Sequence, residues 1–247
     1  MALRRTLMRA FIVGLALAAP TAAGAAALPP GFQRAEFLLE HGVEVMYLGE
    51  LLAETLQIPD AREVLLDAAL EAAALGPRFG PAVREWLASL PGDELAAWLI
   101  GGISAGDVPF HFDSLASVAA GSRDFVLAPL PNHMFTRDAS EWVYGGVAVN
   151  RMASPARRRE SIHTAAIYEF HPRFADATFH TWSDGDLGHP SLDGGDVLVI
   201  GNGCVLVGMG ERSRPAAVEA LAGNVFNAGA ATEVLAVVLP RHRSYMR

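Results

Sequence analysis

The sequence predicts a mixed α/β fold, and three observations carry this prediction. Short β-rich runs alternate with helical patterns at residues 43–57 and again from residue 125 onward, which is typical of strand–helix units. Residues 60–102, between these regions, show helical spacing of apolar residues throughout. The chain has 247 residues and 51% hydrophobic content, so it can bury the core of one large domain or two small ones.

The first half is predicted to be mainly helical, with one short β-rich run at residues 43–48. Helical spacing marks residues 32–40, residues 49–57 and three stretches within 60–102. The last of these stretches follows a Pro-Gly turn, and Asp93 is the expected N-cap because its carboxylate can accept a hydrogen bond from the first turn. Residues 107–123 are polar and predict a loop.

Strands and turns return in the second half. The expected elements are strands at 125–128 and 143–150, a helix at 162–170, hairpin strands at 198–200 and 205–207, a helix at 215–226 and a strand at 234–239. Gly201, Asn202 and Gly203 form the hairpin turn, because Gly and Asn tolerate the positive φ that such turns need. The last strand is continuously apolar, which predicts burial on both of its faces.

The N-terminal residues 1–27 resemble a leader. Arg4, Arg5 and Arg9 precede an apolar run at 10–19 and a small-residue tract, which is the layout of a secretory signal peptide. The tract is rich in alanine and broken by Pro20 and Gly24, so a membrane anchor is less favoured. A misplaced start codon or a frameshift, which would put foreign sequence before the domain, is the third interpretation.

Charge and cysteine content narrow the classes of function. The formal net charge is −8 and the acids are scattered, so a nucleic-acid-binding surface is not supported, and a small polar or cationic ligand fits better. Cys204 is the one cysteine, which excludes an intrachain disulfide and a multi-cysteine metal site. The acids and histidine between 184 and 196 are interpreted as an acidic loop, because a metal site of oxygen ligands has a tighter ligand spacing.

Two polar segments carry charges that could serve a site. Arg137 and Asp138 come after a predicted strand. If they are also extended, their side chains point to opposite faces, so that one of them can enter a site. Spacing alone favours a surface turn with a structural salt bridge. In the same way, the basic residues at 155–160 by themselves predict a solvated helix start.

Taken together, several segments resemble the arginine deiminases of the guanidine-modifying superfamily, in the same order along the chain. These segments are LPNHMFTRD at 130–138, WVYGGVAVNRM at 142–152, PARRRES at 155–161, HPRF at 171–174, LDGGDVLVIGNG at 192–203, VGMGERS at 207–213 and LPRHRSYM at 239–246. The resemblance covers roughly residues 32–246.

The resemblance implies a pentein-type α/β propeller of ββαβ modules with an inserted helical subdomain. We therefore expect a signal-like or spurious leader at 1–27, a first α/β module remnant at 28–58, a helical insertion at 59–106, and propeller modules at 107–247 that are incomplete at the C-terminus. The implied reaction is hydrolysis of L-arginine to L-citrulline and ammonia, in arginine catabolism, with no cofactor and no metal. In this chemistry a cysteine thiolate attacks the guanidinium carbon, a histidine transfers protons, and carboxylates hold the guanidinium nitrogens.

The resemblance also assigns individual residues. Asp138 corresponds to a guanidinium-binding aspartate of the family, and Asn132 to an asparagine near the backbone end of the substrate. Arg157 and Arg212 correspond to the arginines that bind the substrate carboxylate. Asp193 is the second guanidinium-binding acid, where the family usually has glutamate, and its shorter side chain reaches about 1.5 Å less far.

The remaining assignments concern the Asp193 turn and the nucleophile. Gly194, Gly195 and Asp196 are expected to be structural at the site, with Asp196 capping the turn. Asp193 and Arg212 are expected to face opposite ends of the arginine. The family continues beyond the last strand with its histidine and its nucleophilic cysteine, and Cys204 lies where the family has a non-catalytic residue, so the nucleophile is absent and the chain alone is expected to be inactive.

Two other hypotheses stay open: an arginine-binding module without catalysis, and a gene fragment without function. The resemblance implies a cytoplasmic protein, and export through residues 1–27 is the alternative. It also implies that the chain can form a homo-oligomer.

Overall fold

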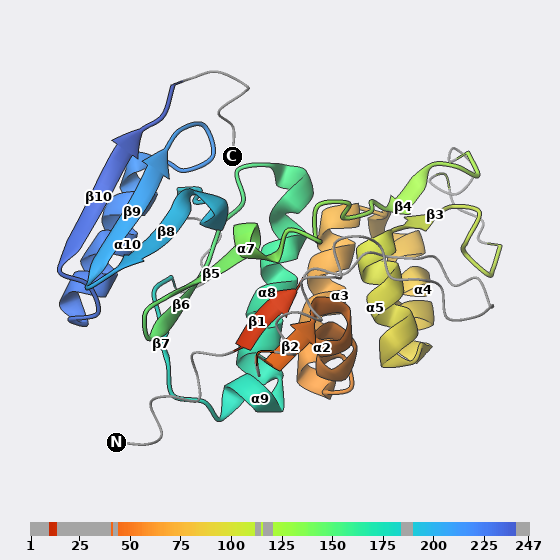
Figure 1. The fold of residues 1–247 in the computed structure, drawn as a ribbon. Coiled ribbons are helices and arrows are strands. Elements are labelled where there is room, and N and C mark those ends of the chain that lie inside the picture. Colours follow the sequence, from red (N-terminus) through yellow and green to blue (C-terminus); the bar gives the residue numbers. More distant parts are fainter. Residues whose placement is uncertain are drawn as a thin grey trace. The chain divides into compact units, whose positions relative to one another are not determined.

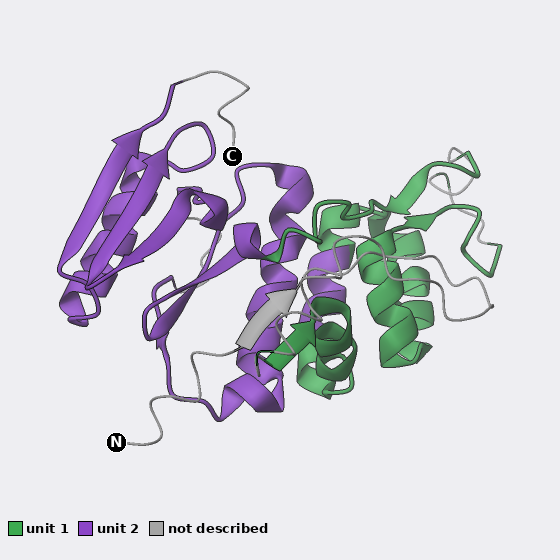
Figure 2. Cartoon of the chain, in the orientation of Figure 1, with its two compact units in different colours: residues 1–62, 70–136 green, residues 63–69, 137–247 purple. Residues whose placement is uncertain are grey.

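The computed structural model describes residues 10–13, 41, 44–111, 115, 121–183 and 190–240. It is a mixed α/β protein with helices and small sheets, as predicted (Figure 1). In the described part of the chain no sheet closes on itself. The residues divide into two compact units, one comprising 1–62 and 70–136 and the other 63–69 and 137–247 (Figure 2).

Helices dominate the first unit. They are α2 (Leu48–Thr55), α3 (Pro59–Ala73), α4 (Gly76–Ser89) and α5 (Gly92–Gly101), with residues 63–69 of α3 assigned to the second unit. Helix α2 packs against α5, and the two helices contribute buried leucines such as Leu52 and Leu99 to the core. The predicted N-cap at Asp93 is wrong: α5 begins at Gly92 after Pro91, so Asp93 lies inside the first turn, where its charge still favours the helix dipole.

The strands of the first unit are short. Strand β1 (Ala10–Val13) pairs in parallel with β2 (Glu44–Tyr47), and β3 (Ile103–Ser104) pairs antiparallel with β4 (Phe125–Leu127). The predicted helix at 32–40 and most of the predicted leader lie outside the described residues. None of the helices that can be described combines the length and the apolar character needed to cross a membrane.

The second unit contains the same strand–strand–helix–strand order twice. Its first copy consists of β5 (Ser140–Val143), β6 (Gly146–Val149), α8 (Arg158–Phe170) and β7 (His180–Thr181), with the short helix α9 (Pro172–Ala175) after α8. Its second copy consists of β8 (Val197–Gly201), β9 (Cys204–Met209), α10 (Pro215–Asn227) and β10 (Glu233–Val238). In each copy the first two strands are antiparallel and the third is parallel to the second. We call these copies module A and module B.

One apolar core joins the two modules. Val205 and Val207 of β9 pack with Leu221 and Val225 of α10, and the same cluster includes residues of module A such as Val143. Helix α10 therefore covers one face of the sheet β8–β9–β10 (Figure 1).

Two strand predictions are wrong in detail. The expected strand at 143–150 is a hairpin of β5 and β6, because Tyr144 adopts a φ of 52° and turns the chain beside Gly145. The expected burial of the last strand also fails. β10 is the end strand of its sheet in the described residues, and Leu235, Val237 and Val238 are exposed, Val238 by 77%.

Candidate functional site

Modules A and B each place an acid and an arginine at equivalent points. In module A, Asp138 lies on the short helix α7 (Thr136–Ala139) before β5, and Arg157 ends the 3₁₀ turn η4 (Pro155–Arg157) before α8. In module B, Asp193 precedes the 3₁₀ turn η5 (Gly194–Asp196) and β8, and Arg212 lies between β9 and α10. The acid and the arginine are 19 residues apart in both modules. Each acid binds the arginine of its own module.

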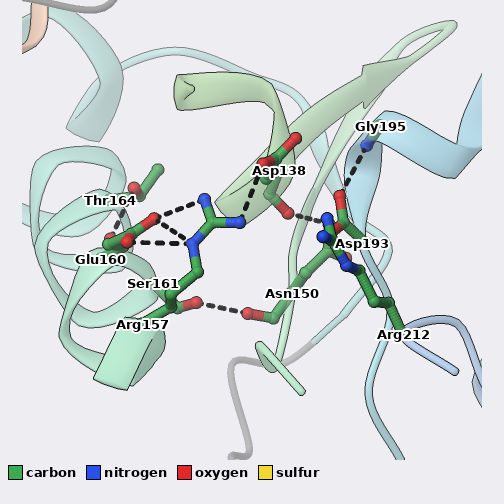
Figure 3. A network of polar contacts seen from close by, with 9 residues as sticks. All are labelled: Asp138, Asn150, Arg157, Glu160, Ser161, Thr164, Asp193, Gly195 and Arg212. Atoms are coloured by element: carbon green, nitrogen blue, oxygen red, sulfur yellow. Dashed lines mark hydrogen bonds and ion pairs between the residues drawn. The ribbon is translucent and has the colours of Figure 1, made fainter. Parts of the chain in front are cut away.

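The first pair is a partly buried network around the Arg157 guanidinium (Figure 3). One terminal nitrogen donates to Asp138 Oδ2 at 2.9 Å, while the other donates to Glu160 Oε2 at 2.7 Å and Nε donates to Glu160 Oε1 at 3.0 Å. Burial raises the pKa of Glu160 although the bonds to Arg157 act in the opposite direction. Asp138 and Glu160 thus hold one planar cation between them, which is the geometry by which carboxylates bind guanidinium groups.

Arg137 links the two modules through hydrogen bonds to backbone carbonyls. Its Nε donates to the carbonyl of Gly194 at 3.2 Å, and a terminal nitrogen donates to the carbonyl of Val197. The prediction that Arg137 and Asp138 point to opposite faces of a strand is wrong, because both lie on the helix α7. The separation of their roles still holds, since Arg137 binds the η5 region and Asp138 binds Arg157.

Asp193 both caps η5 and binds Arg212. Its Oδ1 accepts from the N–H of Gly195 at 3.1 Å, and its Oδ2 lies 3.3 Å from a terminal nitrogen of Arg212. The Asp193 side chain is 4% exposed and that of Arg212 is 36% exposed. The turn cap is therefore Asp193, and the prediction that Asp196 caps the turn is wrong: Asp196 Oδ2 accepts from the Ser213 hydroxyl at 2.6 Å, behind the turn.

Asp193 and Arg212 form a direct ion pair in this structure. The expectation that they face opposite ends of an arginine stays a prediction. Any ligand that binds Asp193 has to displace Arg212 or share the carboxylate with it.

Gly194 and Gly195 allow the turn to approach the acids closely. A Cβ on Gly194 would lie 2.0 Å from the Arg137 carbonyl oxygen and 2.6 Å from Glu141 Oε2. A Cβ on Gly195 would lie 3.1 Å from one carboxylate oxygen of Asp138 and 3.1 Å from one of Asp193. The carboxylates of the two modules thus converge on Gly195.

Burial and the nearness of other acids change the pKa values of the carboxyl groups in this cluster. Burial raises the pKa of Asp193, and the neighbouring charge of Asp138 raises it further, while Gly195 and Arg212 act in the opposite direction. Burial also raises the pKa of Asp196. Two acids that converge in this way favour a cation with several N–H donors.

Three residues of the candidate site were not predicted from the sequence. Glu160 completes the Arg157 pair, and Glu141 and Asn150 lie buried beside it, where Asn150 Nδ2 donates to Glu141 Oε2 and to the carbonyl of Asp138 at 3.2 Å. A signal was present: Asp138 and Glu141 have the same spacing as Asp193 and Asp196, and the arginines follow at equal intervals. An internal comparison of the two modules would have identified the second acid of each.

The other predicted residues belong to other elements of the chain. Asn132 is exposed on a turn of the first unit. Cys204 begins β9, and burial together with the charge of Glu233 raises the pKa of its thiol. In the described part of the chain no group of three or more His, Cys, Asp or Glu residues is placed to hold a metal ion. Asp184, Asp186 and His189 of the predicted acidic loop are outside the described residues.

The second unit also has a hollow of about 750 Å³ that the paired acids do not line. Its walls come from β6, β7 and α10 and include Asn150, Arg151, Trp182 and Asn224. The polar cluster around Asp138 and Asp193, rather than this hollow, contains the converging charges, so we place the candidate site there.

Comparison with known proteins adds a family and a set of related structures. The family model described as arginine deiminase matches residues 32–247. Among solved structures, the chain is similar to a dimethylarginine dimethylaminohydrolase variant carrying an adduct with S-methyl-L-thiocitrulline, and to a mutant of that enzyme from Pseudomonas aeruginosa complexed with citrulline. For both, the identity is 15%, the TM-score is 0.36, and the match covers 45% of this chain and 40% of that chain.

Proposed function

The chain belongs to the arginine deiminase family, and we propose that it binds L-arginine at Asp138 and Asp193 and hydrolyses it to L-citrulline and ammonia. The chain spans about 40% of the length of the solved structures it matches.

One observation carries the binding proposal: both acids already hold guanidinium groups, those of Arg157 and Arg212. The site has the charge, the burial and the oxygen geometry that a guanidinium needs. We propose that the guanidinium of L-arginine takes the place of the internal guanidinium groups on Asp138 and Asp193. The displaced Arg157 and Arg212 then become donors for the α-carboxylate of the same substrate.

Deimination also needs a nucleophile. In the reaction implied by the family, a thiolate attacks the guanidinium carbon, ammonia leaves, and water releases citrulline from the covalent intermediate. The thiol of Cys204 makes none of the described contacts of the Asp138–Asp193 cluster, and its raised pKa favours the protonated form. This observation favours a second candidate function, an arginine-binding module without catalysis.

Calorimetry with L-arginine tests the binding proposal. We expect heat of binding with the native chain, and an affinity at least about tenfold lower for Asp138→Asn, because the neutral amide loses a charge-assisted hydrogen bond. Asp176→Asn is the matched control, since Asp176 is exposed at the end of α9. Absence of heat at millimolar L-arginine would overturn the proposal.

Citrulline release separates the two candidate functions. The purified chain is incubated with L-arginine, and citrulline and ammonia are quantified together. Equal amounts of both products support the deiminase. Binding without product supports the non-catalytic module.

Location and higher architecture belong to the same proposal. We propose a cytoplasmic protein, as the family resemblance implies, and a propeller to which modules A and B contribute two of the ββαβ repeats. Fusion of residues 1–30 to an export reporter tests the location, and export of the reporter would contradict it. Light scattering of the purified chain tests the expected homo-oligomer.

A further inference from the structure

Glu141 is a buried acid that the proposed binding of arginine does not use. It is the second residue of β5 and only 3% exposed. Asn150 Nδ2 donates to its Oε2, and the backbone of Gly194 approaches the same oxygen so closely that a Cβ there would lie 2.6 Å away. Glu141 therefore lies between Asn150 of module A and the Gly194 backbone at the start of module B.

Two atoms of the pair Glu141–Asn150 have no hydrogen-bond partner among the residues that the structure describes. They are Glu141 Oε1 and Asn150 Oδ1, and both are buried. The orientation of the Asn150 amide is fixed by its other atom, because Nδ2 donates to two acceptors, Glu141 Oε2 and the Asp138 carbonyl. With an ionised Glu141, both unpartnered atoms are acceptors facing no donor. A proton on Glu141 Oε1 would supply the donor that Asn150 Oδ1 lacks.

We propose that Glu141 is a positioning residue that carries a proton at neutral pH and pairs as a carboxylic acid with the Asn150 carboxamide. In this pair Asn150 Nδ2–H donates to Oε2 and the Glu141 hydroxyl donates to Asn150 Oδ1. The proposal rests on the proposed binding of arginine at Asp138 and Asp193, because it assigns Glu141 the task of holding those two acids in place.

The pair connects to both acids of the site. Asn150 Nδ2 also binds the Asp138 carbonyl, and the Ser161 hydroxyl donates to the Asn150 carbonyl, so Asn150 is held from two sides (Figure 3). On the other side the Glu141 carboxylate lies close to the backbone of Gly194, which directly follows Asp193. Loss of the proton would place a negative charge beside Asp193 and break one hydrogen bond of the pair.

The charged and titratable groups around Glu141 agree with a neutral acid. Burial raises the pKa of Glu141 to about 8, the hydrogen bond from Asn150 and the charge of Arg137 act against the shift, and the charge of Asp193 adds to it. From α8, Tyr168 also faces this region, and its hydroxyl accepts from Ser140 and from Trp142 Nε1. The only cation among these groups, Arg137, is already engaged by backbone carbonyls of the η5 region.

Glu141→Gln tests the proposal, because glutamine keeps the shape and the neutral state but cannot ionise. Glu169→Gln, an exposed change on the same module, is the matched control. Arginine affinity is measured by calorimetry from about pH 6.5 to about pH 9.5, a range that brackets the raised pKa. We expect the native chain and the control to lose affinity several-fold across this range, and Glu141→Gln to lose distinctly less.

A ligand-free measurement keeps failure of this proposal separate from failure of the proposed function. The infrared band of a protonated carboxylic acid is followed against pH in the native chain and in Glu141→Gln. We expect a band that persists at neutral pH, disappears through about pH 8 and is missing in the variant. Absence of this band near pH 6, or the same pH dependence of affinity in Glu141→Gln as in the native chain, would overturn the proposal.

If calorimetry detects no binding of L-arginine to the native chain, the proposed function is wrong, and so is the positioning role of Glu141. The infrared titration would then still decide whether Glu141 carries the proton. Absence of the band near pH 6 in the native chain would overturn the proposal even if Glu141→Gln does not fold.

Discussion

The Asp193 carboxylate makes two interactions that favour different side-chain lengths. Its Oδ1 caps the η5 turn through the N–H of Gly195, and its Oδ2 pairs with Arg212. The short aspartate arm suits the cap, because the accepting oxygen must reach a backbone N–H only two residues away. A glutamate, which the family resemblance favours here, reaches further into the site and loses this cap.

Asp193→Glu should therefore trade stability for binding. We expect the free energy of unfolding to fall by about 1 kcal/mol through loss of the cap, while the affinity for L-arginine rises. Urea unfolding and calorimetry measure the two effects, with Asp176→Glu as an exposed control. A variant that is both less stable and weaker in binding would show that the aspartate is the better ligand in this chain.

At the residue scale, sequence motifs identified the charged groups but not their contacts. The motifs selected four charged residues that the structure places together in the second unit. They are Asp138, Arg157, Asp193 and Arg212. Their pairing with one another could not be predicted, because it depends on which oxygens point inward after the modules fold. Residue chemistry alone did not indicate Glu141 or Asn150, since a lone acid and amide in a strand sequence are usually surface residues. Only the equal spacing of Asp138–Glu141 and Asp193–Asp196 indicates Glu141.

At the element scale, the turn η5 depends on a glycine for steric reasons. A Cβ at Gly194 would collide with the Arg137 carbonyl at 2.0 Å and with Glu141 at 2.6 Å. Gly145, in the turn of module A, would meet no atom within 4 Å. The two glycines thus provide a matched pair of turn positions with opposite surroundings.

Gly194→Ala is expected to lower the free energy of unfolding by at least about 1–3 kcal/mol, the usual cost of overpacking. Gly145→Ala should change it by less than about 0.5 kcal/mol, as for an open surface site. Both are measured by urea unfolding. Equal stability of the two variants would contradict the close approach of η5 to α7 and β5.

The sheet β8–β9–β10 exposes apolar side chains on the face away from α10. Leu198, Leu206 and Leu235 stand opposite one another across the three strands, and Leu198 and Leu235 are exposed. Exposed apolar strands at a sheet edge promote association between molecules. The continuous apolar sequence of β10 predicted a strand correctly but not its exposure, because burial depends on which elements cover the sheet.

Val238→Lys is expected to reduce self-association. Val238 is 77% exposed on β10, so the change removes little buried surface and should alter the free energy of unfolding by less than about 0.5 kcal/mol. A lysine on an edge strand opposes pairing with another strand. Light scattering against concentration measures the effect, and Ala153→Lys, which adds the same charge at an exposed bend, controls for net charge. Equal association of both variants would assign the effect to charge alone.

At the scale of the whole molecule, the second unit contains the same ββαβ arrangement twice. Modules A and B share strand order, strand direction, an acid before the first strand and an arginine before the helix. Sequence periodicity predicted most of these elements separately. Periodicity did not show the repeat, and ββαβ modules were expected only from the family resemblance. The two modules share positions of charge rather than residue identity, and the expected single strand at 143–150 concealed the first hairpin.

The buried acids of both modules predict how stability depends on pH. Glu141, Glu160, Asp193 and Asp196 all have raised pKa values, with burial as the main cause. Below their ordinary pKa values these groups are protonated in both states. As pH rises, the unfolded chain releases their protons first, so the folded state loses stability until its own groups have ionised, for Glu141 at about 8.

Stability should therefore be greater near pH 5 than near pH 9, and urea midpoints across this range measure it. The lowered pKa of Asp107 acts only below its ordinary value of 3.8, outside this window. Glu141→Gln should flatten the upper part of the decline, because the amide has no proton to lose. A midpoint that stays constant from about pH 5 to about pH 9 would mean that these acids are solvated in the folded protein, and the convergence of the two modules on a shared, buried charge cluster would then be wrong.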